Sequence, residues 1–325
     1  MNRREIITLL GGAAAWPLEA EAQQATMPVI GFLHSGSPEM RRDLVAAFQL
    51  GLKQFGYVEG RNVSVEYRWA DDQYDRLPAS AADLVRREVA VIVAGATPAA
   101  LAVQAATTTI PVVFATAGDP VTSKLVENLA RPRGNLTGIS FLNNTLGAKA
   151  LGLLHEVVPA AATIAFLINP TNPLAELDTR EAQVAADGLK KKLIVVHAST
   201  EADIDAVFAA FDRQHADALM VESDPFLSSR RDQLVALAAR RAVPAVYQLR
   251  EFVAAGGLMS YGTSLTDAYR QVGVYVGRIL RGAKPVDLPV IQSTRFEFAI
   301  NLDTAKSLGL SIPPGILAIA DEVIE

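Results

Sequence analysis

From Pro28 onward, short runs of β-branched residues alternate with stretches in which apolar residues recur every three or four positions. The first pattern is typical of buried strands and the second of amphipathic helices. Strands that alternate with helices form parallel βαβ units, because each helix carries the chain back to the start of the next strand. We therefore predict an α/β fold with parallel sheets.

The length and the apolar content predict two hydrophobic cores. The chain has 325 residues and half of them are hydrophobic, which is enough for two domains of ordinary size. Helices are expected over 38–55, 75–87, 146–157 and 265–280. Strands are expected over 28–34, 62–69, 89–95, 111–116, 138–142, 163–169, 193–198, 218–223, 244–248, 258–264 and 295–301. The first five strands form one group and the next four another.

Helix and strand remain after the second group, so the chain is expected to cross between two lobes more than once. We predict two Rossmann-like lobes joined by a hinge of several segments, near 140–145, 260–264 and 284–294. The N-terminal lobe is expected to hold residues 28–140 plus about 262–284, and the C-terminal lobe residues 141–261 plus about 290–325.

The first 22 residues have the layout of a secretory signal peptide. The basic pair Arg3-Arg4 precedes a short apolar stretch, and Ala20-Glu21-Ala22 provides a cleavage site after about Ala22. The apolar stretch is shorter than the roughly 20 residues that span a bilayer. We therefore expect a soluble, periplasmic protein, exported by the twin-arginine or the general secretory route.

Several function classes are excluded or disfavoured. The chain has no cysteine, so it forms neither disulfides nor thiolate metal sites. The net charge of −5, without a long run of one sign, argues against a nucleic-acid surface. No nucleotide-binding, nucleophile-elbow or zinc-protease motif occurs, and the four histidines lack metal-ligand spacing. We predict neither a metal nor a cofactor. His34, at a strand end, could face a cleft, but we expect it to be a loop histidine.

Small polar residues follow one predicted strand after another. In parallel sheets the carboxyl ends of the strands border the crevice in which ligands bind. The residues that the predicted loops bring there are Ser35, Ser37, Ala96, Thr97, Thr116, Asp119, Asn172, Ser223 and Asp224. With Thr97 as helix cap and Pro98 as first helical residue, the loop near 97 offers free N–H groups to a carboxylate. The alternative is that Thr97, Ser37 and Asp119 only cap their own helices.

Asp224 is an acid at the crevice edge of the second lobe, opposite the predicted anion site. A ligand that carries a carboxylate and an ammonium group would satisfy both walls. Tyr247 and Tyr261 are candidates to cover an apolar or aromatic ligand side chain, although both could equally be core residues.

Seven segments carry a family resemblance: residues 3–18, 68–94, GDPV at 118–121, GNLTGIS at 134–140, 230–262, 267–280 and INLDTAKSLGLSIPP at 300–314. In these segments the chain resembles the ABC-transporter substrate-binding proteins of the type I periplasmic-binding fold, in the group that includes tryptophan- and tyrosine-type uptake binders. The resemblance covers essentially the whole chain, but it does not identify the ligand.

The resemblance implies a bilobal receptor that closes on a small solute and presents it to a membrane permease and its cytoplasmic ATPase. It assigns the ligand carboxylate to Ser37, Thr97 and Thr116, places Asp119 at the base of the site, and gives the ammonium to Asp224. Pro225 stands where many aromatic amino acid binders are expected to have asparagine. The implied ligand is an amino acid, aromatic or branched apolar.

Three alternatives stay open. The ligand could be an aromatic or other organic acid without an amino group. An exported hydrolase-like enzyme could use Asp119 and Asp224 as an acid/base pair, although no activated nucleophile is visible. The effector domain of a transcription regulator would need a DNA-binding helix pair before the first strand, where the signal peptide is predicted instead.

Overall fold

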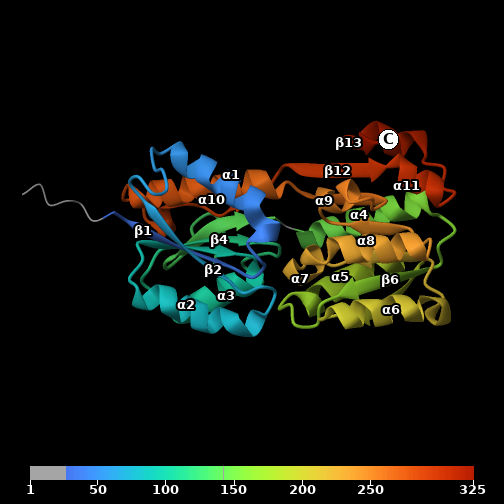
Figure 1. Cartoon of the computed structure of the whole chain (residues 1–325), viewed down its shortest axis with the longest axis horizontal. Helices are drawn as coiled ribbons and strands as arrows, with labels where there is room; N and C mark the ends of the chain where they lie inside the picture. Colours follow the sequence, from blue (N-terminus) through green and yellow to red (C-terminus); the bar gives the residue numbers. More distant parts are fainter. Residues whose placement is uncertain (1–26, 142) are drawn as a thin grey trace, which may run out of the picture.

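A computed structural model describes residues 27–141 and 143–325, so the predicted signal peptide lies outside the described residues. The first lobe is built on a six-stranded parallel sheet in the order β11-β5-β4-β3-β1-β2. Its strands are β1 Val29–His34, β2 Ser64–Trp69, β3 Val91–Gly95, β4 Val112–Thr116, β5 Leu136–Ser140 and β11 Ile291–Gln292. Helices α1 (Arg42–Lys53) and α10 (Leu265–Leu280) cover one face, and α2 (Leu77–Arg86) and α3 (Thr97–Ala106) cover the other (Figure 1).

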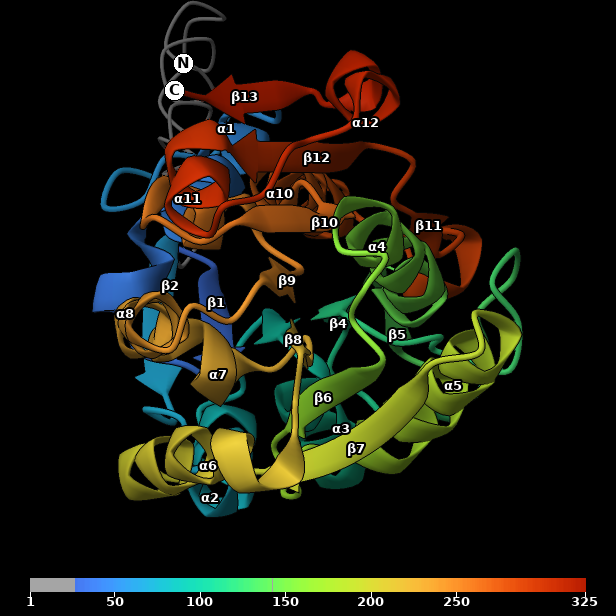
Figure 2. The ribbon, with the colours of Figure 1, turned by 90° about the vertical axis from the view of Figure 1, so that its right-hand side faces the viewer.

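The second lobe has a seven-stranded sheet in the order β13-β12-β10-β9-β8-β6-β7, in which β12 runs antiparallel to β10. Its strands are β6 Thr163–Ile168, β7 Lys192–His197, β8 Ala218–Val221, β9 Ala245–Tyr247, β10 Met259–Thr263, β12 Phe296–Asn301 and β13 Glu322–Ile324. Figure 2 shows α4 (Asn143–Val157) and α5 (Ala175–Gly188) on one side of the strands, and α6 (Glu201–Gln214) and α8 (Arg231–Arg240) on the other. The shorter helices are α7 Pro225–Ser229, α9 Arg250–Ala254, α11 Leu302–Ser307 and α12 Pro314–Ile319.

The predicted two-lobe α/β fold is confirmed, and the observed ends of each predicted strand lie within two residues of the expected ones. The short strands β11 and β13 were not predicted. Residues 291–292 were expected in the C-terminal lobe, but they pair with β5 in the first sheet. The chain passes between the lobes after β5, after β10 and after β11.

Helix α10 returns to the first lobe because it packs closely against α1. A Cβ atom on Gly51 would lie 2.0 Å from the carbonyl oxygen of Arg270, and one on Gly273 would lie 2.1 Å from that of Phe48. The two helix backbones can approach this closely only because both positions lack side chains. This contact fixes the N-terminal end of α10, which carries Leu265 and Tyr269 to the boundary between the lobes.

Candidate functional site

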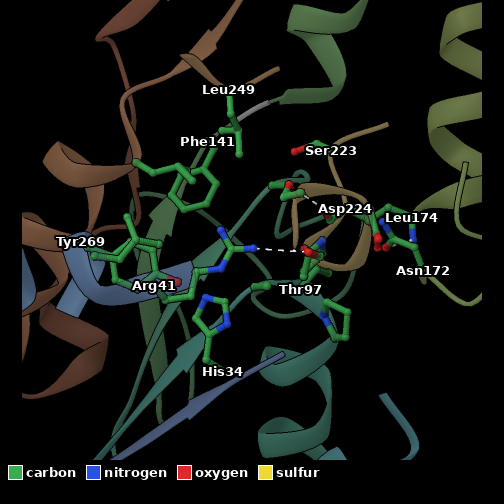
Figure 3. A pocket seen from close by; sticks show the side chains of 17 residues that line it. His34, Arg41, Thr97, Phe141, Asn172, Leu174, Ser223, Asp224, Leu249 and Tyr269 are labelled. Carbon is green, nitrogen blue, oxygen red and sulfur yellow. Dashed lines mark hydrogen bonds between the residues drawn. The ribbon is translucent and has the colours of Figure 1, made fainter. Parts of the chain in front are cut away.

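The carboxyl ends of the two sheets border a cavity between the lobes (Figure 3). The end of β1 with the segment that follows it, the loops after β3, β4 and β5, and the start of α10 form its first-lobe wall. Loops after β6, β8 and β9 form its second-lobe wall. Of the predicted site residues, Ala96, Thr97, Asn172, Ser223 and Asp224 line this cavity. It is therefore the candidate ligand site.

One residue of the loop after β3, at the cavity wall, has a strained backbone conformation. Ala96 has φ 76° and ψ 156°, a conformation that residues other than glycine rarely adopt. Its N–H donates to the carbonyl of Ala115 at 2.8 Å, and its own carbonyl accepts from Ala100 at 3.1 Å. Ala96 is thus the N-cap of α3, and the prediction that Thr97 is the cap was wrong. Thr97 is instead the first helical residue, and its buried hydroxyl has no partner among the described residues.

Replacing Ala96 with glycine should raise the free energy of unfolding by about 1 kcal/mol. Glycine relieves about 1–3 kcal/mol of strain, partly offset by the larger entropy of the unfolded chain. Urea denaturation measures the change. Ala102→Gly, in the interior of α3, is the matched control and should lower stability by about 1 kcal/mol. If both variants lose stability, the backbone conformation at Ala96 does not lower the stability of the protein.

Arg41, which the sequence analysis did not single out, places a buried positive charge in the cavity. The residue is 8% exposed, and Figure 3 shows its guanidinium between His34 and Phe141. Nη2 makes one long bond of 3.4 Å to the carbonyl of Pro225, and Nε has no partner among the described residues. Arg41 forms no salt bridge within the described part of the chain. Burial raises the pKa of the nearby Asp72, and the charge of Arg41 offsets only part of that rise. A buried guanidinium in this state favours an anionic ligand.

His34 lies at the buried end of β1 and lines the cavity, so it is not the loop histidine that we expected. Burial, reinforced by the charge of Arg41, holds the pKa of its imidazole well below the usual range, so the ring is neutral. Its Nδ1 accepts a hydrogen bond from the N–H of Gly36 at 2.8 Å. The ring proton is therefore on Nε2, and His34 can donate it.

Asp224 faces the cavity from the second lobe and has three partners. It caps α7 by accepting from the N–H of Leu227 at 3.0 Å, and it accepts from the amide of Asn169 at 3.2 Å. The hydroxyl of Tyr74, in the first lobe, donates to its other oxygen at 2.6 Å. Together with the bond from the Ser229 hydroxyl to Asp72 at 2.5 Å, this contact holds the lobes closed on each other.

The second lobe holds a cluster of buried carboxyl groups at this wall, of which only Asp224 lines the cavity itself. Burial raises the pKa of Asp224 to about 6 and that of Asp178 to about 7, and the pKa of Glu222 lies well above its usual range. Glu222 accepts hydrogen bonds from the backbone of Asn169 and the side chain of Asn172. None of these carboxylates forms a salt bridge within the described residues. A cationic group on a ligand would stabilise their ionised forms.

Asp178 should make the fold less stable as the pH rises. Its carboxyl ionises near 3.8 in the unfolded chain and near 7 in the folded one, so its cost appears between about pH 4 and pH 7 and persists above. Asp178→Asn should therefore melt about 3 °C higher than the parent at pH 8 and at the same temperature near pH 4. Differential scanning calorimetry measures the melting temperatures of both proteins at the two pH values. Asp187→Asn, exposed on the same helix, serves as control; an equal gain there would refute the burial argument.

The predicted aromatic residues are not in the cavity. Tyr247 is 1% exposed and stacks on Phe252 with ring centroids 4.4 Å apart, inside the second-lobe core. Tyr261 packs against Phe296 and Phe298. Both tyrosines therefore pack in the core of the second lobe, which was the alternative to a ligand-binding role. The residues that give the cavity its apolar surface come from segments far apart in the sequence: Leu44, Phe141, Leu174, Leu249, Leu265 and Tyr269.

Four further predicted residues do not line the cavity: Ser35, Ser37, Thr116 and Asp119. Ser35 and Thr116 are fully buried behind the wall, with hydroxyls that have no partner among the described residues. Asp119 accepts from the N–H of Val121 and the hydroxyl of Thr122, so it stabilises its own loop. The acid/base pair of Asp119 and Asp224 therefore does not form in this cavity.

In the described part of the chain, no helix is long and apolar enough to cross a membrane. Within the same residues, no group of three or more histidine, aspartate or glutamate side chains could hold a metal ion.

Comparisons with known proteins agree with the fold and the site. The family described as "ABC transporter substrate binding protein" matches residues 33–324. A tyrosine-binding protein from Clostridioides difficile is 25% identical over 264 residues, which are 81% of this chain and 75% of that protein. Two solved structures each cover 91% of this chain and 99% of their own. One is a conserved domain protein from Vibrio cholerae (28% identity, TM-score 0.85), and the other an ABC domain from Streptococcus pneumoniae in complex with L-Trp (26%, 0.84). These matches confirm the predicted family resemblance.

Proposed function

Because this chain belongs to the ABC transporter substrate-binding proteins, which are receptors and not enzymes, we propose that it binds an amino acid between its lobes and delivers it to a permease. The proposed ligand has an aromatic or branched apolar side chain. The proposed location is the periplasm, after removal of residues 1–22.

The observation that carries this proposal is the opposite charge of the two cavity walls. Arg41 on the first-lobe side is a buried cation without a salt bridge among the described residues, beside the free hydroxyl of Thr97. Asp224 on the second-lobe side is a buried acid without a cationic partner there. An amino acid brings a carboxylate to the first wall and an ammonium to the second. Its binding thus favours closure, because one ligand contacts both lobes.

The apolar surface of the cavity favours an aromatic side chain. Phe141 and Tyr269 offer ring faces, and Leu249 and Leu265 extend the apolar surface. The relatives support this choice, because one is named a tyrosine-binding protein and another was solved with L-Trp.

A second candidate ligand is an organic acid without an amino group. The hydrogen bonds that Asp224 already accepts from Tyr74, Asn169 and Leu227 favour it, because they leave fewer lone pairs for an ammonium group. Such an acid would still satisfy Arg41.

A thermal-shift screen of residues 23–325, refolded after unfolding to remove carried-over solute, tests the proposal. The probes are L-tyrosine, L-tryptophan, L-phenylalanine, L-leucine and the deaminated acid of each. A ligand raises the melting temperature by mass action. Shifts with the amino acids alone support the proposal, and shifts with the deaminated acids alone support the second candidate. If no probe shifts the melting temperature, both are wrong.

A further inference from the structure

A second, smaller cavity lies beside the first in the second lobe. Ser223 lines both cavities. The other walls of the second cavity include the polar side chains of Asp178 and Gln248 and the apolar side chains of Phe166 and Met220. This cavity is not used in the binding mode proposed above.

Three segments place the two cavities next to each other. Leu174, the N-cap residue of α5, lines the first cavity, and Asp178, four residues later in the first turn of α5, lines the second. After β9, Gln248 lines the second cavity and Leu249 the first. After β8, Ser223 separates them. A ligand in the first cavity therefore needs to reach only past Ser223 to enter the second.

The second cavity presents two buried acceptors without donors. Oδ1 of Asp178 and Oε1 of Gln248 are both inaccessible to solvent and have no hydrogen-bond partner among the described residues. Gln248 as a whole is 7% exposed. Burying an acceptor without a donor costs free energy, so such a pair is expected to meet a donor in the functional complex.

We propose that this cavity binds a hydrogen-bond donor, a hydroxyl or ring N–H, at the far end of the ligand side chain. The inference rests on the proposed function. With the carboxylate at Arg41, the ligand body would extend towards Phe141, Leu249 and Ser223, which Figure 3 shows at the end of the cavity away from His34. The donor then reaches Asp178 and Gln248. The receptor thereby selects aromatic amino acids with a polar tip over phenylalanine.

Calorimetric titration with L-tyrosine and p-fluoro-L-phenylalanine tests the inference, because the two differ by one donor at nearly the same size. The parent should bind tyrosine at least about tenfold more tightly. Gln248→Met keeps the volume but removes the acceptor, so it should abolish this preference and leave affinity for the fluoro compound within about twofold. Gln183→Met, exposed on α5, is the matched control and should retain the preference.

Asp178→Asn provides a second variant, because it removes a buried charge and is expected to fold at least as well as the parent. At pH 8, where Asp178 is ionised, it should reduce the preference for tyrosine, since a neutral acceptor binds a donor less strongly than a carboxylate. Equal binding of tyrosine and the fluoro compound by the parent would overturn this inference and leave the proposed function standing. If neither binds, the proposed function for aromatic amino acids fails as well.

Discussion

Replacing Arg41 with methionine is expected to weaken binding of the proposed amino acid about 1,000-fold, equivalent to about 4 kcal/mol. Arg41 is buried, lines the cavity, and has a single long hydrogen bond to Pro225. Its guanidinium can bind a carboxylate with two parallel hydrogen bonds, which lysine cannot. Arg41→Lys should therefore recover only part of the affinity. Calorimetric titration with L-tyrosine measures both variants.

Removing the carboxylate from the ligand tests whether Arg41 acts through that group. Tyramine keeps the ring and the ammonium of tyrosine but lacks the carboxylate. It should therefore bind the parent weakly, and its affinity for Arg41→Met should be the same as for the parent. Such a double-mutant cycle separates the pair from general effects on the cavity. Arg42→Met, at the exposed neighbouring position, should bind tyrosine like the parent. If Arg41→Met weakens tyrosine and tyramine equally, the carboxylate lies elsewhere.

The strands could be predicted because most of them are buried on both faces. The interiors of β3, β4 and β8 are continuous apolar or small runs, which is the pattern expected of parallel strands covered by helices. The two-residue β11 and three-residue β13 have no comparable pattern. Pairing with β5 and β12 defines them, and such contacts between distant segments leave little local signal.

The position of the candidate site could be predicted, but its principal charge could not. Thr97 and Asp224 follow strands whose ends border the crevice, so topology alone brings them there. Arg41 is one of two adjacent arginines, and nothing in the composition distinguishes the buried one. One signal was present: Arg41 precedes Leu44 by three residues and Phe48 by seven, which places it on the buried face of the helix.

The aromatic residues could not be assigned because side chains alternate across a strand. Tyr247 ends β9 and points into the core, whereas Gln248 and Leu249 beyond it reach the two cavities. An error of one position in the predicted strand therefore assigns a side chain to the wrong face of the sheet. Phe141 lies on a crossing segment and Tyr269 on a helix that returns from the second lobe, so their place in the site depends on how the lobes pack.

Replacing Asp224 with asparagine is expected to weaken amino acid binding about 100-fold while the deaminated acid binds as before or more tightly. Asparagine retains Oδ1, which accepts from both the N–H of Leu227 and the amide of Asn169, so α7 stays capped. It loses the charge that would pair with the ligand ammonium, and its amide nitrogen would face the Tyr74 hydroxyl, which can then only accept from it. The measurement is calorimetric titration with L-tyrosine and 3-(4-hydroxyphenyl)propionate.

Tyr74→Phe separates this pairing from closure of the lobes. The variant removes the hydrogen bond of 2.6 Å between the lobes but leaves the charge of Asp224, so the binding of both ligands should weaken by a similar factor.

The pH dependence of binding gives a second criterion. Burial raises the pKa of Asp224 to about 6, so tyrosine binding to the parent should weaken as the pH falls through 6, and Asp224→Asn should lose that dependence. If Asp224→Asn binds both ligands as well as the parent does, Asp224 serves the closed structure through its bonds to Tyr74 and Leu227, and the ligand needs no ammonium.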